Sequence, residues 1–239
     1  MSEINSFKKG IKDGIPICLG YLSVSFAFGI FATESGLSVL QTLLVSMLNV
    51  TSAGQLAGVP IITAGGAFLE LAISQLVINL RYALMSVSLS QKLGKSMRLF
   101  DRFIISFVNT DEVFAVASGQ KESVGKNYLY GLILTPYLGW SFGTLLGAIA
   151  GNILPDGITS ALGIAIYGMF VAIVIPEAKK SKPTALCAVL AVILSCIFEY
   201  TPLLNKIPAG FIIIICAVIS SGIFACIAPI KDEEVTANE

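Results

Sequence analysis

The sequence lacks histidine and carries little charge, and both absences narrow its chemistry. None of the 239 residues is histidine, and only 13% are charged. Without imidazole, histidine-based acid–base catalysis and histidine-ligated metal sites are excluded. There is no Walker sequence, no GxSxG or HExxH motif and no long basic run, and the net charge is zero. We therefore expect no enzyme activity, no cofactor and no nucleic-acid partner.

Cysteines are few and form no redox or metal motif. All five lie in apolar runs, without a CxxC spacing. We interpret them as packing residues rather than as disulfide partners or metal ligands, and we predict no metal site. They are Cys18, Cys187, Cys196, Cys216 and Cys226.

Hydrophobic residues dominate the chain. They make up 55% of it, and the mean hydropathy is +0.85. Between positions 15 and 91 the only acidic or basic side chains are Glu34, Glu70 and Arg81. Because a run of about 20 apolar residues spans a bilayer, we predict an all-α polytopic membrane protein that forms a single transmembrane domain over residues 1–239.

Apolar runs and their breakers predict six full crossings and two broken or re-entrant elements. The crossings are Ile15–Thr33, Ala67–Leu89, Tyr128–Gly151, Ile158–Ile175, Thr184–Tyr200 and Ile207–Ile230. The first irregular element, Leu37–Thr63, is interrupted by small and polar residues at positions 49–55. The second, Phe103–Gly119, carries four consecutive polar residues from Asn109 to Glu112. Such residues can satisfy the backbone groups that a helix break sets free.

Basic residues predict the orientation, because lysine and arginine in short loops favour the cytoplasm. They cluster at residues 8–12, 92–102, 121–126 and 179–182. If every candidate segment crossed, the 92–102 cluster would lie outside. It lies inside if both irregular elements enter and leave on one side. We therefore predict a multi-pass protein of a bacterial inner membrane, whose termini (residues 1–14 and 231–239) are cytoplasmic.

Arg81 is the sharpest candidate for function. A guanidinium stays charged, so inside a membrane it needs an anion, carbonyl groups or water. Its partners could be Glu70, Asp111, Glu112 or a ligand carboxylate. Glu70 is about three helical turns away, on the same face but too far for contact. Alternatively, Arg81 snorkels from a span's end toward headgroups, beside an interfacial aromatic residue.

The segment Thr51–Gln55 is the second candidate. If the chain breaks here, the next half-helix presents free N–H groups and a positive dipole end to an anionic group such as an amino-acid carboxylate. Ser52 is the expected N-cap, and Gly54 allows a ligand to approach the backbone. The alternative is that these small residues only permit close helix packing, but that leaves the amide of Gln55 unexplained.

Further polar and glycine positions extend the candidate set. The amides of Gln75 and Asn79 lie four residues apart and can share a helix face. Asp111 and Glu112 point about 100° apart on a helix, so one of them could relay a proton or pair with Arg81, or both could be solvated. Four glycines with GxxxG spacing predict a close helix seam, either internal or with another subunit. They are Gly139, Gly143, Gly147 and Gly151.

A weak internal echo is also present. Gly20-Tyr21, followed by Phe28-Gly29 and a turn at 35–37, is similar to Gly139-Trp140, followed by Gly147 and a turn at 156–158. Repeats of this kind are common in secondary transporters, whose substrates bind near the membrane midplane at discontinuous helices.

Together, several short motifs resemble the AzlC/YgaZ-type large subunits of branched-chain amino-acid exporters. They are Gly20-Tyr21, Phe26–Ile30, Gly36–Ser38, Ser52–Gln55, Asn79–Tyr82, Asp111–Ala115 and Gly139-Trp140. The resemblance implies an inner-membrane exporter of leucine, isoleucine, valine and analogues. It also implies an ion gradient as the driving force and a small multi-spanning AzlD-type subunit as the partner.

Two functional hypotheses follow. In the first, the chain is an export permease in the lipid bilayer, and a zwitterionic amino acid binds at Ser52, Gly54, Gln55, Asn79 and Arg81. Proton coupling or an ion pair would then involve Asp111, Glu112 or Glu70. In the second hypothesis, the chain is a non-transporting scaffold whose glycine seam holds a partner transporter.

Overall fold

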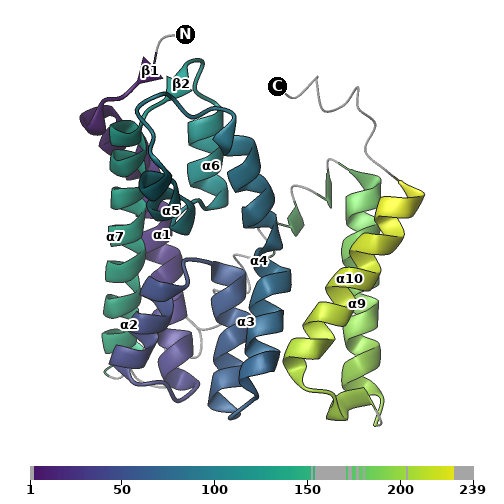
Figure 1. The fold of residues 1–239 in the computed structure, drawn as a ribbon. Coiled ribbons are helices and arrows are strands. Elements are labelled where there is room, and N and C mark those ends of the chain that lie inside the picture. Colours follow the sequence, from purple (N-terminus) through teal and green to yellow (C-terminus); the bar gives the residue numbers. More distant parts are fainter. Residues whose placement is uncertain are drawn as a thin grey trace.

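The computed structural model describes residues 3–151, 153, 171, 174, 175, 178, 179, 181–202 and 204–228. Its described part is dominated by α-helices, with two strands of two residues each, β1 (Glu3–Ile4) and β2 (Ser123–Val124). The all-α membrane fold is therefore confirmed (Figure 1). The helices are α1 (Phe7–Glu34), α2 (Val39–Leu48), α3 (Ser52–Thr63), α4 (Phe68–Ser90), α5 (Leu99–Phe107), α6 (Asp111–Ser118), α7 (Lys126–Gly151), α9 (Lys182–Tyr200) and α10 (Ala209–Ile227), with a short 3-10 helix η1 (Leu204–Lys206).

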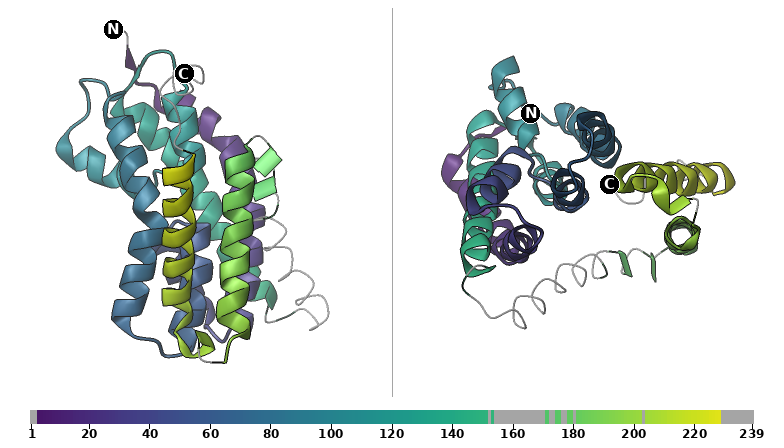
Figure 2. Two further views of the ribbon diagram at one scale, coloured as in Figure 1. Left: turned by 90° about the vertical axis from the view of Figure 1, so that its right-hand side faces the viewer. Right: turned by 90° about the horizontal axis from the view of Figure 1, so that it is seen from below.

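Five of these helices are long and apolar enough to cross a membrane: α1, α4, α7, α9 and α10. They match five of the six predicted crossings. The sixth, Ile158–Ile175, falls almost entirely outside the described residues. Seen from below in Figure 2, α3 and α4 lie between the α1–α7 pair and the α9–α10 pair. Helix α10 packs against both α3 and α4.

The glycine seam joins α1 to α7 inside the chain. A Cβ atom at Gly139 would lie 2.7 Å from the Cys18 backbone oxygen, and one at Gly147 would overlap the backbone oxygen of Phe26. The two helices therefore pack backbone to backbone, and they run in the same direction. The internal echo places Tyr21 on α1 and Trp140 on α7, where their rings form an edge-to-face contact with centroids 5.0 Å apart.

The two irregular elements are helical hairpins that enter the bundle from opposite ends. In Figure 1, α2 and α3 occupy the lower half of the molecule, and α5 and α6 occupy the upper half. Non-helical residues 49–51 and 108–110 form the two tips. The prediction of two broken or re-entrant elements is therefore confirmed. The second one starts earlier than Phe103, because the Arg98 N–H donates to the Asp101 carboxylate (2.9 Å) and begins α5 at Leu99.

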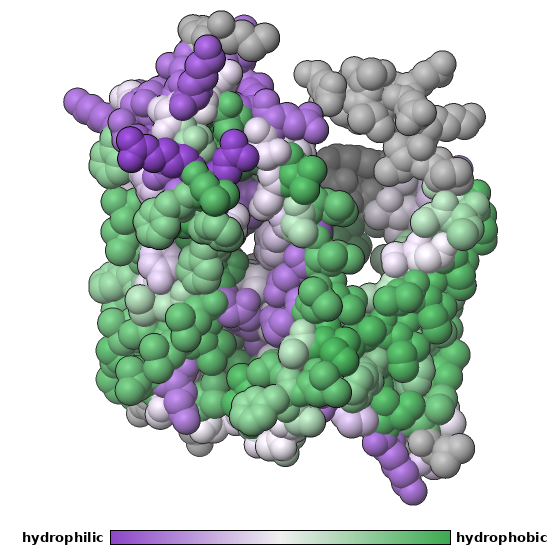
Figure 3. Space-filling view, in the orientation of Figure 1, coloured by the Kyte–Doolittle hydropathy of each residue, from purple (hydrophilic) through white to green (hydrophobic). Residues whose placement is uncertain are grey.

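The N-terminus and the basic loops gather at one end of the bundle. Strand β1 pairs in parallel with β2, and Leu93 forms a further bridge to Val124. This ties the N-terminal segment to the 92–102 loop. Hydrophilic residues concentrate at the same end in Figure 3, above a broad apolar band. The loop is thus on the N-terminal side, as the re-entrant arrangement requires.

Candidate functional site

The two hairpin tips meet beside a cavity of about 360 Å³. Its lining comes from α1, from α4, from both tips and from α7, so several elements that are distant in sequence build it. A volume of roughly 300–1,000 Å³ is usual for small-molecule sites. The lining residues are Tyr21, Val50, Thr51, Ser52, Ala53, Arg81, Tyr82, Thr110, Asp111, Glu112 and Trp140.

Arg81 and Asp111 form an ion pair in this cavity. An Arg81 guanidinium nitrogen (Nη1) lies 2.8 Å from the Asp111 Oδ2, and the side chains keep 51% and 46% exposure, respectively. A second guanidinium nitrogen donates to the Tyr82 hydroxyl (3.1 Å), and the guanidinium also lies over the Tyr82 ring. Of the three carboxylates considered from the sequence, the structure pairs Arg81 with Asp111. Because both members remain half exposed, the pair is open to a ligand.

Glu112 lines the same cavity through a different contact. The Tyr21 hydroxyl donates to its carboxylate and lies 2.6 Å from the Thr110 hydroxyl oxygen. Consecutive residues on α6 thus reach opposite partners, Asp111 toward α4 and Glu112 toward α1. Tyr21 in turn packs on Trp140, which gives the cavity an aromatic wall beside its charged one.

The start of α3 lies at the cavity, where its first backbone N–H groups have no intrahelical partner. The first N–H groups of any α-helix lack an intrahelical carbonyl partner, and here Ser52 and Ala53 are the first helical residues and line the cavity. The predicted cap is wrong by one position, since the N-cap is Thr51, whose hydroxyl accepts from the Gly54 N–H (3.4 Å). Either hydroxyl residue could have capped the break, so the sequence did not separate them.

A network of side-chain amides braces the first hairpin against α4. Gln75 donates through Nε2 to the Gly54 backbone oxygen (2.8 Å), and its Oε1 accepts from Asn49 (3.0 Å) and Asn79 (3.2 Å). A side chain at Gly54 would collide with the Gln75 amide. Gly54 is thus a residue of close packing beside the site, while Asn79 lines a neighbouring cavity.

Two further sequence candidates lie away from the cavity. Gln55 is fully buried, and its Nε2 donates to the Val45 backbone oxygen (3.5 Å), so it joins α3 to α2. Glu70 is 5% exposed and accepts from the Gly210 N–H (3.0 Å) at the start of α10. The structure therefore brings together Ser52, Arg81, Asp111 and Glu112, and it places Gln55 and Glu70 in helix-to-helix contacts.

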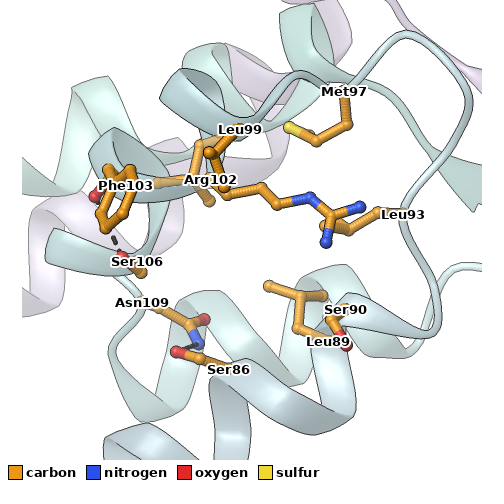
Figure 4. A pocket seen from close by; sticks show the side chains of 11 residues that line it. Ser86, Leu89, Ser90, Leu93, Met97, Leu99, Arg102, Phe103, Ser106 and Asn109 are labelled. Carbon is orange, nitrogen blue, oxygen red and sulfur yellow. Dashed lines mark hydrogen bonds between the residues drawn. The ribbon is translucent and has the colours of Figure 1, made fainter.

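Two further cavities lie between the site and the basic end. A cavity of about 240 Å³ shares Val50, Thr51, Tyr82 and Thr110 with the central one. Beyond it, a cavity of about 210 Å³ lies between α4 and α5 and ends near the 92–102 loop. Figure 4 shows the Arg102 side chain reaching into this outer cavity, with Ser86 and Asn109 hydrogen-bonded on its inner side.

Sequence reasoning missed the aromatic wall and two of the asparagines. Tyr21 and Trp140 belong to the internal echo and to the family resemblance, but neither pattern indicated that they line a site, although a polar-tipped aromatic residue in a transmembrane run can mark a site as well as an interface. Asn49 and Asn109 were noted only as helix breakers. Their roles depend on the meeting of the two tips, which are distant in sequence.

Crossing helices, two opposed re-entrant hairpins and a charged cavity at their tips define a polytopic α-helical membrane protein with a central polar site. The sequence family model described as "AzlC protein" matches residues 16–154. The chain therefore belongs to the AzlC family. No solved structure matches it.

Relatives span most of the chain. An uncharacterized membrane protein of Archaeoglobus fulgidus is 33% identical over 75% of this chain and 79% of its own length. The inner membrane protein YgaZ of Escherichia coli K12 is 27% identical over 77% of this chain and 78% of its own length. An uncharacterized membrane protein of Helicobacter pylori strain 26695 is 23% identical over 82% of this chain and 89% of its own length.

Proposed function

We propose that this protein is the transport subunit of an exporter for branched-chain amino acids. The observation that carries the proposal is the central cavity, where an open Arg81–Asp111 pair and the start of α3 lie beside an aromatic and aliphatic wall. A zwitterionic amino acid has complementary groups. Its carboxylate suits Arg81 or the N–H groups of Ser52 and Ala53, and its ammonium group suits Asp111 or Glu112.

The apolar part of the cavity supports a small aliphatic side chain. Tyr21, Val50 and Trp140 line it with carbon-rich surface, so a leucine, isoleucine or valine side chain would bury apolar area there. Discontinuous helices at mid-depth are the usual substrate and ion sites of secondary transporters. An ion gradient is the proposed driving force, with Asp111 or Glu112 as a proton-coupling group.

The basic end of the bundle supports a cytoplasmic N-terminus. Lysine and arginine residues concentrate there, and α10 ends at that same end in Figure 1. We therefore propose that both termini lie in the cytoplasm of a bacterial inner membrane. A small AzlD-type subunit is the proposed partner. The exposed apolar α9, none of whose residues is buried in this chain, leaves surface for such a subunit or for lipid.

The competing hypothesis of a non-transporting scaffold loses its main argument. It used the GxxxG seam as the docking surface for a partner, but α1 fills this seam along its length. A partner would have to use other surfaces, and the polar cavity would have no role in holding it. Transport by this chain accounts for both features.

Counterflow of radiolabelled leucine into proteoliposomes tests the function, with the small subunit present and absent. Arg81→Ala and Asp111→Ala should reduce leucine uptake to the level of empty vesicles, because each removes one member of the ion pair. Lys95→Ala, at an exposed position in the basic loop, is the matched control and should transport normally. Equal uptake by the wild type and both site variants would refute the proposal.

A further inference from the structure

Between the two hairpin tips lies the cavity of about 240 Å³, and three asparagines line it. Asn49 comes from the α2–α3 tip, Asn79 from the middle of α4, and Asn109 from the α5–α6 tip. Three elements thus contribute asparagines to one cavity between the hairpin tips.

A chain of hydrogen bonds fixes the orientation of these amides. The Gly54 backbone oxygen can only accept, so Gln75 turns its Nε2 toward it and its Oε1 away. That Oε1 can only accept as well, so Asn49 and Asn79 both turn their NH2 groups to it. Asn109 donates through Nδ2 to the Ser86 hydroxyl (3.2 Å), a contact drawn in Figure 4.

The carbonyl oxygens of two of these amides have nothing to bind. Within the described residues, Oδ1 of Asn79 and Oδ1 of Asn109 are buried and have no hydrogen-bond partner. The Asn109 side chain belongs to a residue that is only 2% exposed. Buried polar atoms in native proteins are normally paired with protein, ordered water or an ion. Asn79 and Asn109 both line this cavity, so a ligand that donates a hydrogen bond or carries a positive charge would complement their unpaired oxygens.

We propose that this asparagine-lined cavity binds a monovalent cationic group through amide and hydroxyl oxygens. Oxygen ligands select hard cations, and discontinuous helices add free backbone carbonyls at the same depth. No acidic residue is among the described residues that line it, and neutral oxygens alone suit a single positive charge better than a divalent ion. Sodium ion and the α-ammonium group of an amino acid are two sources of this chemistry.

The cavity adjoins the proposed substrate site. The two share four lining residues, including Thr51 and Thr110, so a cation here would sit next to a substrate at the Arg81–Asp111 pair. A shared boundary is the arrangement that coupling between an ion and a substrate needs. The coupling role rests on the proposed transport function, but the binding itself does not, and it can be tested without transport.

Thermal unfolding of the purified full-length protein in detergent provides the test. Sodium chloride is compared with N-methylglucamine chloride at equal ionic strength, and leucine with 4-methylpentanoate, which lacks the ammonium group. The variants are Asn79→Ala and Asn109→Ala. The control is Asn127→Ala, at an exposed position on α7 near the basic end. Because Asn109→Ala could fail to fold, Asn109→Asp is added, which keeps the shape and supplies a negative charge.

Sodium should raise the melting temperature of the wild type and of Asn127→Ala. Its apparent affinity should fall about tenfold or more in both alanine variants, the factor for about 1.4 kcal/mol, and rise in Asn109→Asp. If sodium has no effect but leucine stabilises through Asn79 and Asn109, and 4-methylpentanoate does not, the cationic group is the ammonium. The proposal is wrong if neither compound stabilises the wild type, or if the asparagine variants respond like the wild type.

Discussion

At the scale of single residues, Gln75 organises the centre of the molecule. Its amide contacts the Gly54 carbonyl and two asparagines, so one side chain sets the position of the first hairpin and the direction of the neighbouring amides. A half-buried side chain that satisfies three groups in a helix bundle cannot be replaced by an apolar one without leaving donors and acceptors unpaired.

Gln75→Ala should therefore destabilise the protein by about 1–3 kcal/mol, the range for leaving a buried polar group unsatisfied. Unfolding of the purified protein in mixed micelles measures this loss. Gln91→Ala is the matched control, since Gln91 is exposed at the end of the same helix. A loss no larger than that of the control would show that the amide network does not hold the hairpin.

Sequence alone anticipates part of this residue-level picture. Arg81 stands out because a permanent charge in an apolar run must find a partner, and it did find a carboxylate. Helix geometry already placed Glu70 too far from Arg81 for contact, but the choice between the adjacent Asp111 and Glu112 depended on the tertiary fold. Gln55 illustrates the converse, since a polar residue beside a helix break faced the packing of α2 instead of the cavity.

At the scale of elements, the α1–α7 pair is the rigid part of the structure. Glycines on α7 let the two backbones touch along most of their length. Glycines on α1 likewise lie against the backbone of α7. Small residues that allow close approach replace the hydrophobic effect as the basis of helix association in lipid. The four-residue spacing of the α7 glycines predicted this seam. It did not predict which helix fills the seam, because a GxxxG pattern does not specify its partner helix.

Gly147→Ala should prevent normal assembly, since the new Cβ would overlap the backbone oxygen of Phe26 and neither backbone can move away cheaply. Gly20→Ala is the matched control in the same helix pair. Its Cβ would meet nothing within 4 Å, and replacing a helical glycine favours the helix by up to about 1 kcal/mol. Yield of monodisperse protein and its melting temperature report both effects. Equal behaviour of the two variants would argue against close packing at the seam.

Both hairpins were predictable as breaks because polar residues cluster at their tips. Their pairing was not, because positions 49–51 and 108–110 are far apart in sequence and meet only after α4 has crossed between them. The same reason hides the cavity itself. Each wall of the cavity comes from a short segment with no functional signature of its own. The charged and aromatic groups face one cavity only because the fold brings these segments together.

At the scale of the whole molecule, the two opposed hairpins determine the sidedness of the loops between α1 and α7. The basic 92–102 loop lies at the same end as the N-terminus, and the turn around Gly65 lies at the other end (Figure 1). With the five native cysteines replaced by alanine, a single cysteine at Lys95 should react with an impermeant thiol reagent only after spheroplasts are opened. One at Gly65 should react in intact cells. The reverse pattern would invert the proposed orientation, and reaction of both on one side would contradict the fold.

The central claim is that an amino acid binds where the hairpin tips meet, and substrate protection of Ser52→Cys tests it most directly. This position lines the cavity at the start of α3. In the cysteine-free background, a small hydrophilic thiol reagent should modify Ser52→Cys in proteoliposomes, and leucine should slow the modification in a concentration-dependent way. Leucine should leave the labelling of Lys95→Cys unchanged. A labelling rate at Ser52→Cys that leucine does not alter, in protein that still transports leucine, would place the substrate elsewhere and contradict the account.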